Sequence, residues 1–218
     1  MTTPENTTRL CLIRHGETDW NVELRLQGHT DTSLNARGMA QAAALGRALA
    51  SYRFDAVIAS DLLRARQTAQ PLVEGRELPL RLAPALRERH FGCCEGMTLA
   101  EIRAELPDVA QALTGRAPDY APPGGESTAQ HRSRVIGGIT TLAQQFSGKC
   151  IAVIFHGGSL EMVYRHVHRM PLEPMRDFPL PNASINWLRV GGGDWVFESW
   201  GETAHLGDIP VSPVVSGV

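Results

Sequence analysis

LCLIRHGET, residues 10–18, joins a short apolar run directly to an arginine and a histidine, Arg14 and His15. The apolar residues predict a buried strand, and the polar residues after them predict a loop at its carboxyl end. A neutral imidazole nitrogen can attack phosphorus, while an adjacent guanidinium holds the phosphoryl oxygens. Gly16 lets the backbone approach a bound anion closely. The segment therefore predicts a phosphate site, although an Arg-His pair at a strand end can also do no more than solvate an edge.

Apolar runs rich in β-branched residues alternate along the chain with alanine- and leucine-rich segments of helical period. Strands are expected at residues 10–13, 56–59, 80–82 and 151–155, and helices at 36–50, 61–73, 98–106 and 127–146. Residues 184–190 and 195–200 flank a GGGD turn and predict a terminal hairpin. The pattern predicts a single α/β domain in which a mostly parallel sheet is covered on both faces, a three-layer α/β/α sandwich.

Local signals suggest where the helices begin and end. Ser60 is expected to cap the helix at 61–73, and Thr98 with Glu101 forms a capping-box pattern before a helix that stops at Pro107. Prolines and glycines dominate residues 117–125, which predict an exposed loop. We expect a flexible N-terminus over 1–8, one domain over 9–205 and a poorly ordered tail over 206–218.

Composition excludes several classes of protein. The net charge is -2 over 218 residues, and without a basic patch we expect no nucleic-acid partner. The polar N-terminus lacks the apolar segment of a signal peptide, and no run approaches the roughly 20 apolar residues of a membrane span. The four cysteines, Cys11, Cys93, Cys94 and Cys150, have no zinc-site spacing and indicate reduced thiols. We therefore expect a cytoplasmic protein that does not bind membranes.

Three predicted strand ends carry groups suited to phosphate. Arg14 and His15 follow the first strand, Arg64 follows the second, and His156 follows the buried run at 151–155. In open α/β sheets, ligands bind at the carboxyl ends of the strands. These side chains are therefore expected to meet in one crevice.

Four segments together resemble a known family. They are RHGETDWN (14–21), ASDLLRARQTA (59–69), LRERHFGCCEG (86–96) and FHGGSLE (155–161). They are similar to the signature segments of the histidine phosphatase superfamily, in its phosphoglycerate mutase-like branch. The resemblance runs from about residue 10 to residue 185, and it implies the phosphoglycerate mutase-like fold.

The resemblance implies roles for five residues. His15 would be the nucleophile that forms a phosphohistidine, and Arg14, Arg64 and His156 would hold the phosphoryl oxygens. His156 is expected to be protonated and His15 neutral, with the Gly16 backbone or a nearby carbonyl fixing the His15 tautomer. Glu88 would be the general acid. The alternative for Glu88 is a surface ion pair with a neighbouring arginine, Arg87 or Arg89, and Glu95 is a nearby competitor for the role of general acid.

Other assignments rest on motif position. Asn21 would contact the phosphoryl group or merely form a turn, and Gly157 would add a backbone N–H to the phosphate cradle. Glu126 and Ser127 would shape the pocket rim or only begin a helix. Selectivity would come from a lid at 96–125, together with Arg25, His29 and Arg87. Cys93 and Cys94 stand where many relatives carry tryptophan, which predicts altered packing beside Glu88 and a smaller pocket wall, or a redox-sensitive pair.

Three functions compete. The first is a phosphatase that hydrolyses small phosphorylated metabolites through phosphohistidine. The second is a 2,3-bisphosphoglycerate-dependent phosphoglycerate mutase, which would need further cations. The compact segment 96–123 offers only Arg103, Arg116 and Tyr120, which favours the phosphatase. The third is a non-catalytic module that binds a phosphorylated metabolite, which the complete set of catalytic residues disfavours.

The expected partner is a small phosphorylated metabolite, and no cofactor is expected. We expect no metal, because the spacing of His166 and His168 does not place both side chains on one helical face. An edge strand or the terminal hairpin makes a homodimer possible.

Overall fold

Six strands form one sheet in the order β3-β2-β4-β1-β5-β6 in the computed structural model, which describes residues 7–210. The strands are β1 (Thr8–Arg14), β2 (Ala56–Ala59), β3 (Leu80–Leu82), β4 (Cys150–Phe155), β5 (Ile185–Gly191) and β6 (Asp194–Glu202). Strands β1 to β4 pair in parallel, whereas β5 runs antiparallel to β1 and forms a hairpin with β6. The mostly parallel sheet and the terminal hairpin are as the sequence predicts.

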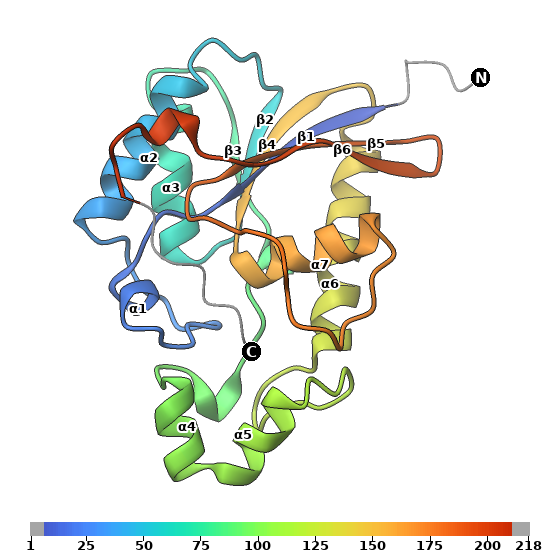
Figure 1. Cartoon of the computed structure of the whole chain (residues 1–218). Helices are drawn as coiled ribbons and strands as arrows, with labels where there is room; N and C mark the ends of the chain where they lie inside the picture. The colour runs from blue at the N-terminus through green and yellow to red at the C-terminus, as the bar shows by residue number, and fades with distance from the viewer. Residues whose placement is uncertain (1–6, 211–218) are drawn as a thin grey trace.

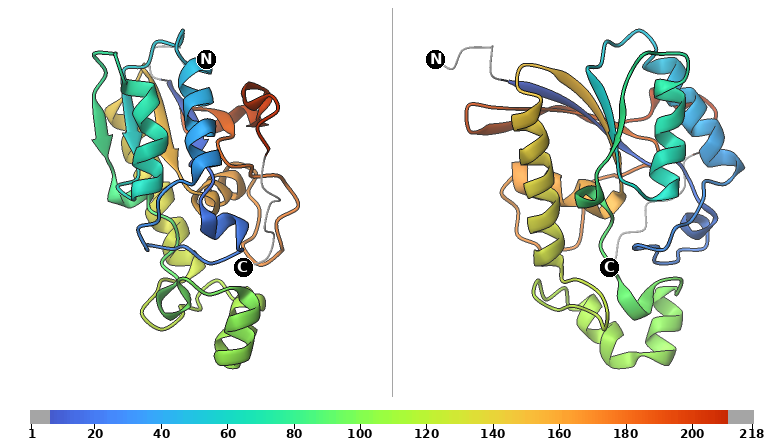
Figure 2. Two further views of the ribbon diagram at one scale, coloured as in Figure 1. Left: turned by 90° about the vertical axis from the view of Figure 1, so that its left-hand side faces the viewer. Right: turned by 180° about the vertical axis from the view of Figure 1, so that it is seen from behind.

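Seven α-helices accompany the sheet within the described part of the chain. They are α1 (Asp19–Val22), α2 (Ala36–Ala48), α3 (Leu63–Val73), α4 (Leu99–Glu105), α5 (Pro107–Thr114), α6 (Thr128–Gln145) and α7 (Gly157–Val167). Helices α2 and α3 cover one face of the sheet, and α6 and α7 cover the other (Figures 1 and 2). This arrangement confirms the three-layer sandwich.

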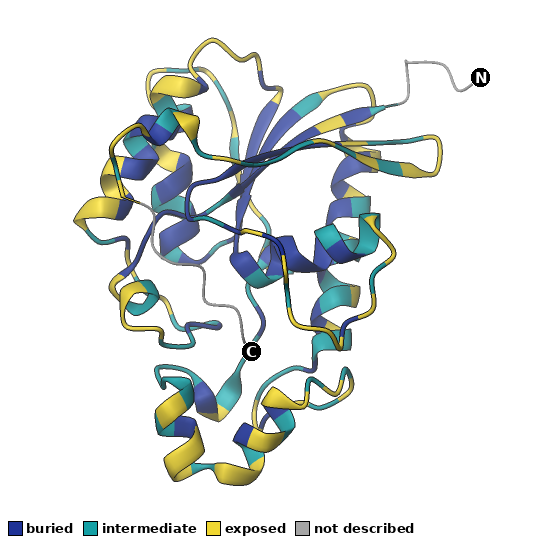
Figure 3. Cartoon of the chain, viewed as in Figure 1, coloured by how far each residue is buried: buried dark blue, intermediate teal, exposed yellow. Residues whose placement is uncertain are grey.

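The first strand explains why both faces are covered. Side chains alternate between the two faces of a strand. Leu10 and Leu12 enter the core beneath α6 and α7, and Cys11 and Ile13 enter the core beneath α2 and α3. All four side chains are fully buried, as Figure 3 shows for the central strands. A strand buried on both faces is apolar at every position, which is why residues 10–13 form a continuous apolar run.

Helices α4 and α5 form a small unit beside the sheet (Figure 1). Ile102, Ala110 and Leu113 pack with Cys94 in a separate apolar cluster. The predicted capping box of Thr98 and Glu101 is present at the start of α4. Pro107 begins α5 as well as ending the helix before it; α5 is a helix that the sequence did not predict.

Helix α3 begins later than expected. Its N-cap is Leu62, with no side-chain hydrogen bond, so the prediction that Ser60 caps this helix is wrong. The Ser60 hydroxyl lies instead 2.8 Å from Nε2 of His156. That hydroxyl also accepts from the backbone N–H of Leu62 at 3.4 Å, but Leu62 is itself the N-cap, so this contact precedes the first turn of the helix.

Two residues that were expected to lie in the flexible ends, Thr8 and Leu206, belong to folded elements. Thr8 is part of β1 and buried, and Leu206 packs into the core beneath α2 and α3, so both residues belong to the folded domain. Residues 1–6 and 211–218 of the expected flexible N-terminus and tail lie outside the described residues. Over residues 7–210, no helix combines the length and apolar character needed to cross a bilayer.

Candidate active site

A cavity opens at the carboxyl ends of the parallel strands and brings the predicted residues together. Arg14 ends β1, His15 follows it, Arg64 lies on α3, and Gly157 begins α7; all four line the cavity with Glu88, which follows β3. His156 is fully buried, and its ring lies against that of His15. Topology therefore gathers residues separated by up to 143 positions, from Arg14 to Gly157.

His15 is held as a neutral base. Its Nδ1 lies 2.7 Å from the carbonyl oxygen of Gly16, so Nδ1 carries the proton and donates it. Burial, and then the nearby charges of Arg64 and Arg14, hold the pKa of His15 well below its usual value. The lone pair therefore resides on Nε2. The expectation that the Gly16 carbonyl fixes this tautomer agrees with the geometry.

Two buried guanidiniums lie beside His15. Arg64 donates to the carbonyl oxygens of Gly28 at 2.8 Å and Thr30 at 2.9 Å, and Arg14 donates to that of Leu180. Burial lowers the pKa of each arginine to about 10, so both are charged at neutral pH. The Nε atoms of both are buried with no hydrogen-bond partner among the described residues. Fixed, charged donors without partners suit an anion.

His156 is neutral in this structure. Burial, and then the charges near it, lower its pKa well below the usual value, with Arg64 the largest of those charges. The expectation that His156 is protonated is therefore wrong for the protein without a bound phosphate. Its Nδ1 is buried without a partner among the described residues, and its Nε2 is held by Ser60. The side chain thus still has unmet hydrogen-bonding capacity.

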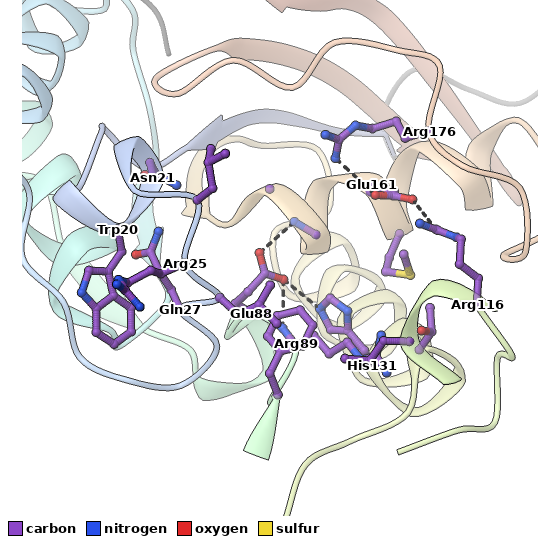
Figure 4. Close-up of a pocket in the computed structure, with 18 of the residues that line it drawn as sticks. Trp20, Asn21, Arg25, Gln27, Glu88, Arg89, Arg116, His131, Glu161 and Arg176 are labelled. Carbon is purple, nitrogen blue, oxygen red and sulfur yellow. Dashed lines mark hydrogen bonds and ion pairs between the residues drawn. The ribbon is translucent and has the colours of Figure 1, made fainter. Parts of the chain in front are cut away.

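Glu88 is the carboxylate at the cavity. Its Oε1 accepts from the backbone N–H of Arg89 at 2.9 Å, and its Oε2 accepts from that of Gly158 at 2.8 Å (Figure 4). The ion-pair alternative fails: Arg87 pairs with Asp61, and the Arg89 guanidinium donates to backbone carbonyls. Two backbone donors fix the carboxylate in one position.

Glu95, the competitor, has a structural role. Its carboxylate accepts from the backbone N–H groups of His29 and Thr30, each at 2.9 Å, and from that of Phe91 at 3.1 Å. Glu95 is not among the described residues that line the cavity. The structure therefore favours Glu88 over Glu95 for any proton transfer there.

Asn21 forms the expected turn, and its contact with a phosphoryl group stays a prediction. It lines the cavity, and it is also the third residue of α1, where it completes a capping box with Thr18. Its Oδ1 accepts from the Thr18 backbone at 3.1 Å and from Nδ2 of Asn182 at 3.2 Å. These bonds occupy the carbonyl oxygen and orient the amide.

Gly157 and Gly158 lie where a side chain would interfere. A Cβ atom at Gly157 would lie 3.1 Å from Nε of Arg14, and one at Gly158 would lie 2.4 Å from Oε1 of Glu88. Gly157 is the first residue of α7, whose N-terminal end favours negative charge. The absence of a side chain at both glycines lets the start of α7 lie close to Arg14 and Glu88.

Several rim predictions need correction. Arg25 lines the cavity, but His29 and Arg87 are not among its lining residues. The imidazole of His29 stacks on that of His90, with ring centroids 4.6 Å apart. Ser127 caps α6, and Glu126 pairs with Arg134, so these two residues build the start of a helix.

The cysteine pair does not form the pocket wall. Cys94 is buried in the α4–α5 cluster and Cys93 is exposed, with 3.9 Å between their sulfur atoms. Neither is among the described lining residues, whereas Phe91 and Trp20 are. The expected smaller wall at this position is therefore wrong, because Cys94 points into a different core.

The polar lining residues that were not predicted as site residues include His131, Glu161 and Arg176. Buried His131 has Nε2 at 3.0 Å from Oγ of Ser159 and at 3.6 Å from Oε1 of Glu88. Glu161 ends the FHGGSLE segment, so its proximity to His156 was a usable signal. Arg176 lies in an irregular segment before β5, where no sequence pattern marks it.

The charge available in the cavity comes from side chains. Within the described range, no cluster of three or more histidine, cysteine, aspartate or glutamate side chains is arranged to hold a metal ion. A neutral imidazole, two fixed guanidiniums and a positioned carboxylate are the parts needed for nucleophilic attack on a phosphate ester. Fold and site together indicate an α/β enzyme of phosphoryl transfer, and His15 is the candidate nucleophile.

The comparison with known families agrees. Residues 10–203 match the model of the histidine phosphatase superfamily (branch 1), and the chain belongs to this family. It is a phosphomonoester hydrolase of the phosphoglycerate mutase-like type.

Individual relatives extend over nearly the whole chain. The chain is 32% identical to a metal-independent phosphoserine phosphatase of Arabidopsis thaliana, over 93% of this chain and 84% of that protein. It is 30% identical to a probable phosphoglycerate mutase GpmB of Proteus mirabilis, over 94% of this chain and 98% of that protein. Among solved structures, YhfR of Bacillus stearothermophilus superposes with a TM-score of 0.85 at 31% identity, covering 91% of this chain and 99% of that one.

Proposed function

We propose that the protein hydrolyses small phosphorylated metabolites through a phosphohistidine at His15, with Glu88 as general acid and base. The observation that carries the proposal is the hydrogen bond of 2.7 Å between His15 Nδ1 and the Gly16 carbonyl. That bond leaves the Nε2 lone pair for attack, in a cavity that it shares with Arg14, Arg64 and Glu88.

In the first step, Nε2 of His15 attacks phosphorus, and the bond from phosphorus to the ester oxygen breaks. Glu88 gives its proton to that leaving oxygen, so an alcohol departs. The Nδ1–H of the phosphohistidine keeps its hydrogen bond to Gly16. Arg14 and Arg64 stabilise the charge on the equatorial oxygens, and His156 contributes a further hydrogen bond.

In the second step, water replaces the alcohol. Glu88 accepts a proton from the water, whose oxygen attacks phosphorus while the bond from phosphorus to Nε2 breaks. Inorganic phosphate leaves and His15 returns to its neutral form. The same carboxylate thus serves as acid and then as base, and the backbone N–H groups of Arg89 and Gly158 keep it in place.

A mutase is the second candidate, because relatives named as probable phosphoglycerate mutases share this fold and length. A mutase must retain a bisphosphate and return a phosphoryl group to it. Of the three groups that the segment 96–123 offers, Arg103 is exposed and does not line the cavity, whereas Arg116 and Tyr120 line it. The segment thus supplies a single cation to the cavity, which favours hydrolysis.

The test follows phosphate release from a panel of small phosphate esters that includes 3-phosphoglycerate. Formation of 2-phosphoglycerate is followed in the same samples, with and without 2,3-bisphosphoglycerate. We expect phosphate release without isomerisation. Isomerisation that depends on bisphosphate and outpaces hydrolysis would establish the mutase instead.

A further inference from the structure

A single carboxylate holds three arginines at one side of the cavity. Glu161 Oε1 accepts from Arg165 Nε at 2.8 Å and from Arg116 Nη2 at 3.2 Å, while Oε2 accepts from Arg176 Nη1 at 3.3 Å. Arg165 is fully buried, and its other nitrogens donate to the carbonyls of Pro171 and Pro174. Arg165 therefore completes the fold, whereas Arg116 and Arg176 both line the cavity (Figure 4).

The two lining arginines are fixed in place. Nε and Nη2 of Arg116 both donate to the carbonyl oxygen of Leu172, at 3.4 Å and 3.2 Å, in addition to the bond with Glu161. Arg176 binds the opposite oxygen of the same carboxylate. Glu161 itself is only 6% exposed, so it lies in a low-dielectric setting where these contacts are strong. A guanidinium that is already oriented loses little entropy when it binds an anion.

This pair lies next to the phosphoryl site. Burial, and then the charge of Arg176, lower the pKa of Arg14; burial also lowers the pKa of Arg176, which the charge of Glu88 partly offsets. Arg176 therefore lies within electrostatic range of both. Arg116 lines the same cavity from the segment after α5, near Tyr120 and Leu113.

The other arginines of the outer cavity have structural roles. Arg25 pairs with Glu23 and Glu101, each through one contact shorter than 3 Å, at 2.8 Å and 2.7 Å. Arg89 donates to the carbonyls of Glu126 and Tyr120. The group formed by Arg116, Arg165, Arg176 and Glu161 has three positive charges and one negative charge. It is thus the cationic part of the outer wall.

We infer that Arg116 and Arg176, oriented by Glu161, form a second anion subsite that binds a negatively charged group on the alcohol part of the substrate. The inference rests on the proposed function and narrows its substrate class to phosphate monoesters with a second anionic group, a carboxylate or a second phosphate. Planar guanidinium forks suit both groups. A neutral phosphorylated alcohol would leave this subsite without its ligand.

Three substrates with one carbon skeleton separate the cases. Glycerol 3-phosphate has no second anion, 3-phosphoglycerate has a carboxylate, and glycerol 1,3-bisphosphate has a second phosphate. We expect kcat/KM to be about 10- to 100-fold higher for at least one of the two doubly anionic esters, the scale of one charge-assisted contact. The preferred ester identifies the anion.

Variants with a matched control assign the preference to these residues. Arg116 adopts a φ of 52°, which asparagine tolerates, so Arg116→Asn removes the charge with little strain. Arg169 has a φ of 53°, is exposed and does not line the cavity, so Arg169→Asn is the control. Arg116→Asn and Arg176→Gln should each reduce the substrate preference about tenfold, and Arg116→Lys should restore part of it. Arg169→Asn should keep it.

Binding measurements separate this inference from the proposed function. In a His15→Ala background, calorimetry gives the affinity for each of the three esters without turnover. Tighter binding of a doubly anionic ester, lost on adding Arg116→Asn or Arg176→Gln, supports the subsite even where hydrolysis fails. Equal affinities for all three esters, or a preference that both variants retain, overturn the subsite while leaving hydrolysis of simple esters as a separate result.

Discussion

The imidazole rings of His15 and His156 lie 5.2 Å apart between centroids, with their planes inclined by 59°. Each ring is held through one nitrogen: His15 Nδ1 by the Gly16 carbonyl at 2.7 Å, and His156 Nε2 by the Ser60 hydroxyl at 2.8 Å. Both rings are neutral because burial and Arg64 lower their pKa values. Two adjacent histidines are thus fixed in orientation without a positive charge on either.

Replacing His15 should abolish turnover. With His15→Ala, no nitrogen is available for attack, and we expect kcat to fall by about 10⁴-fold or more. Stopping the wild-type reaction early with alkali should preserve an acid-labile phosphoprotein that the variant lacks. If the variant forms as much phosphoprotein as the wild type, the phosphoryl group is carried by another residue.

Replacing Glu88 should affect substrates according to their leaving groups. Glu88→Gln cannot donate a proton, so hydrolysis of alkyl phosphates should slow by about 10²- to 10⁴-fold. Nitrophenyl phosphate needs less help and should slow much less. Glu105→Gln, an exposed change on α4, is the control. Equal losses on both substrates would argue against Glu88 as the acid.

Gly158→Ala should displace the carboxylate of Glu88 while leaving residue 88 itself unchanged. The new Cβ atom would lie 2.4 Å from Oε1 of Glu88, so the carboxylate must move. We expect the substitution to slow hydrolysis of alkyl phosphates more than that of nitrophenyl phosphate. The pattern is that of Glu88→Gln, with smaller losses. Gly137→Ala on α6 meets nothing within 4 Å and should instead add about 0.5–1 kcal/mol of stability. Unchanged kinetics in Gly158→Ala would show that the loop yields.

Acid should destabilise the fold through buried histidines. Burial lowers the pKa values of His15, His131 and His156 well below 6.5. Below pH 6.5 the unfolded chain binds protons that the folded chain does not, so the free energy of unfolding falls with pH. Each such histidine contributes up to about 1.4 kcal/mol per pH unit. The loss continues down to the lowered folded-state pKa values.

Urea denaturation between pH 7 and pH 5.5 measures that slope. His131→Gln removes one titrating group, and the slope of the variant should be shallower by up to about 1.4 kcal/mol per pH unit, a limit approached at the acid end of this range. The absolute stability of the variant at pH 7 does not enter the comparison. A slope equal to that of the wild type would mean that His131 titrates normally in the folded protein.

Vanadate should inhibit competitively with the phosphate ester, because it adopts the five-coordinate geometry of the transition state. The guanidiniums of Arg14 and Arg64 supply the positive charge in the proposed reaction, so EDTA should leave the steady-state rate unchanged. A rate that EDTA abolishes and an added divalent metal restores would contradict the proposed mechanism.

Much of the fold follows from local sequence. The apolar run at 10–13 predicts β1 because a strand buried on both faces needs apolar side chains at every position. Thr98 and Glu101 predict the start of α4, since their capping box is local. The convergence of Arg14, His15, Arg64 and His156 was predictable as well, because parallel strands share one carboxyl edge.

Other features were not visible in the sequence. Ser60 has the chemistry of a helix cap, yet it contacts His156, which is 96 residues away. His29 and Arg87 were expected at the rim, but neither lines the cavity: the imidazole of His29 contacts the backbone carbonyl of Glu88, and Arg87 pairs with Asp61. Local pattern gives the residue type, not the direction in which its side chain points.

The sequence by itself determined the alternation of strands and helices and the candidate residues of the phosphoryl site, because periodicity, caps and strand ends are local properties. Only the tertiary structure decided that Glu88 rather than Glu95 faces the cavity, and that Glu161 holds Arg116 and Arg176 beside it. Those choices depend on which distant backbone donors and charges meet each carboxylate. The packing of the whole chain determines those contacts, and short-range sequence patterns do not encode them.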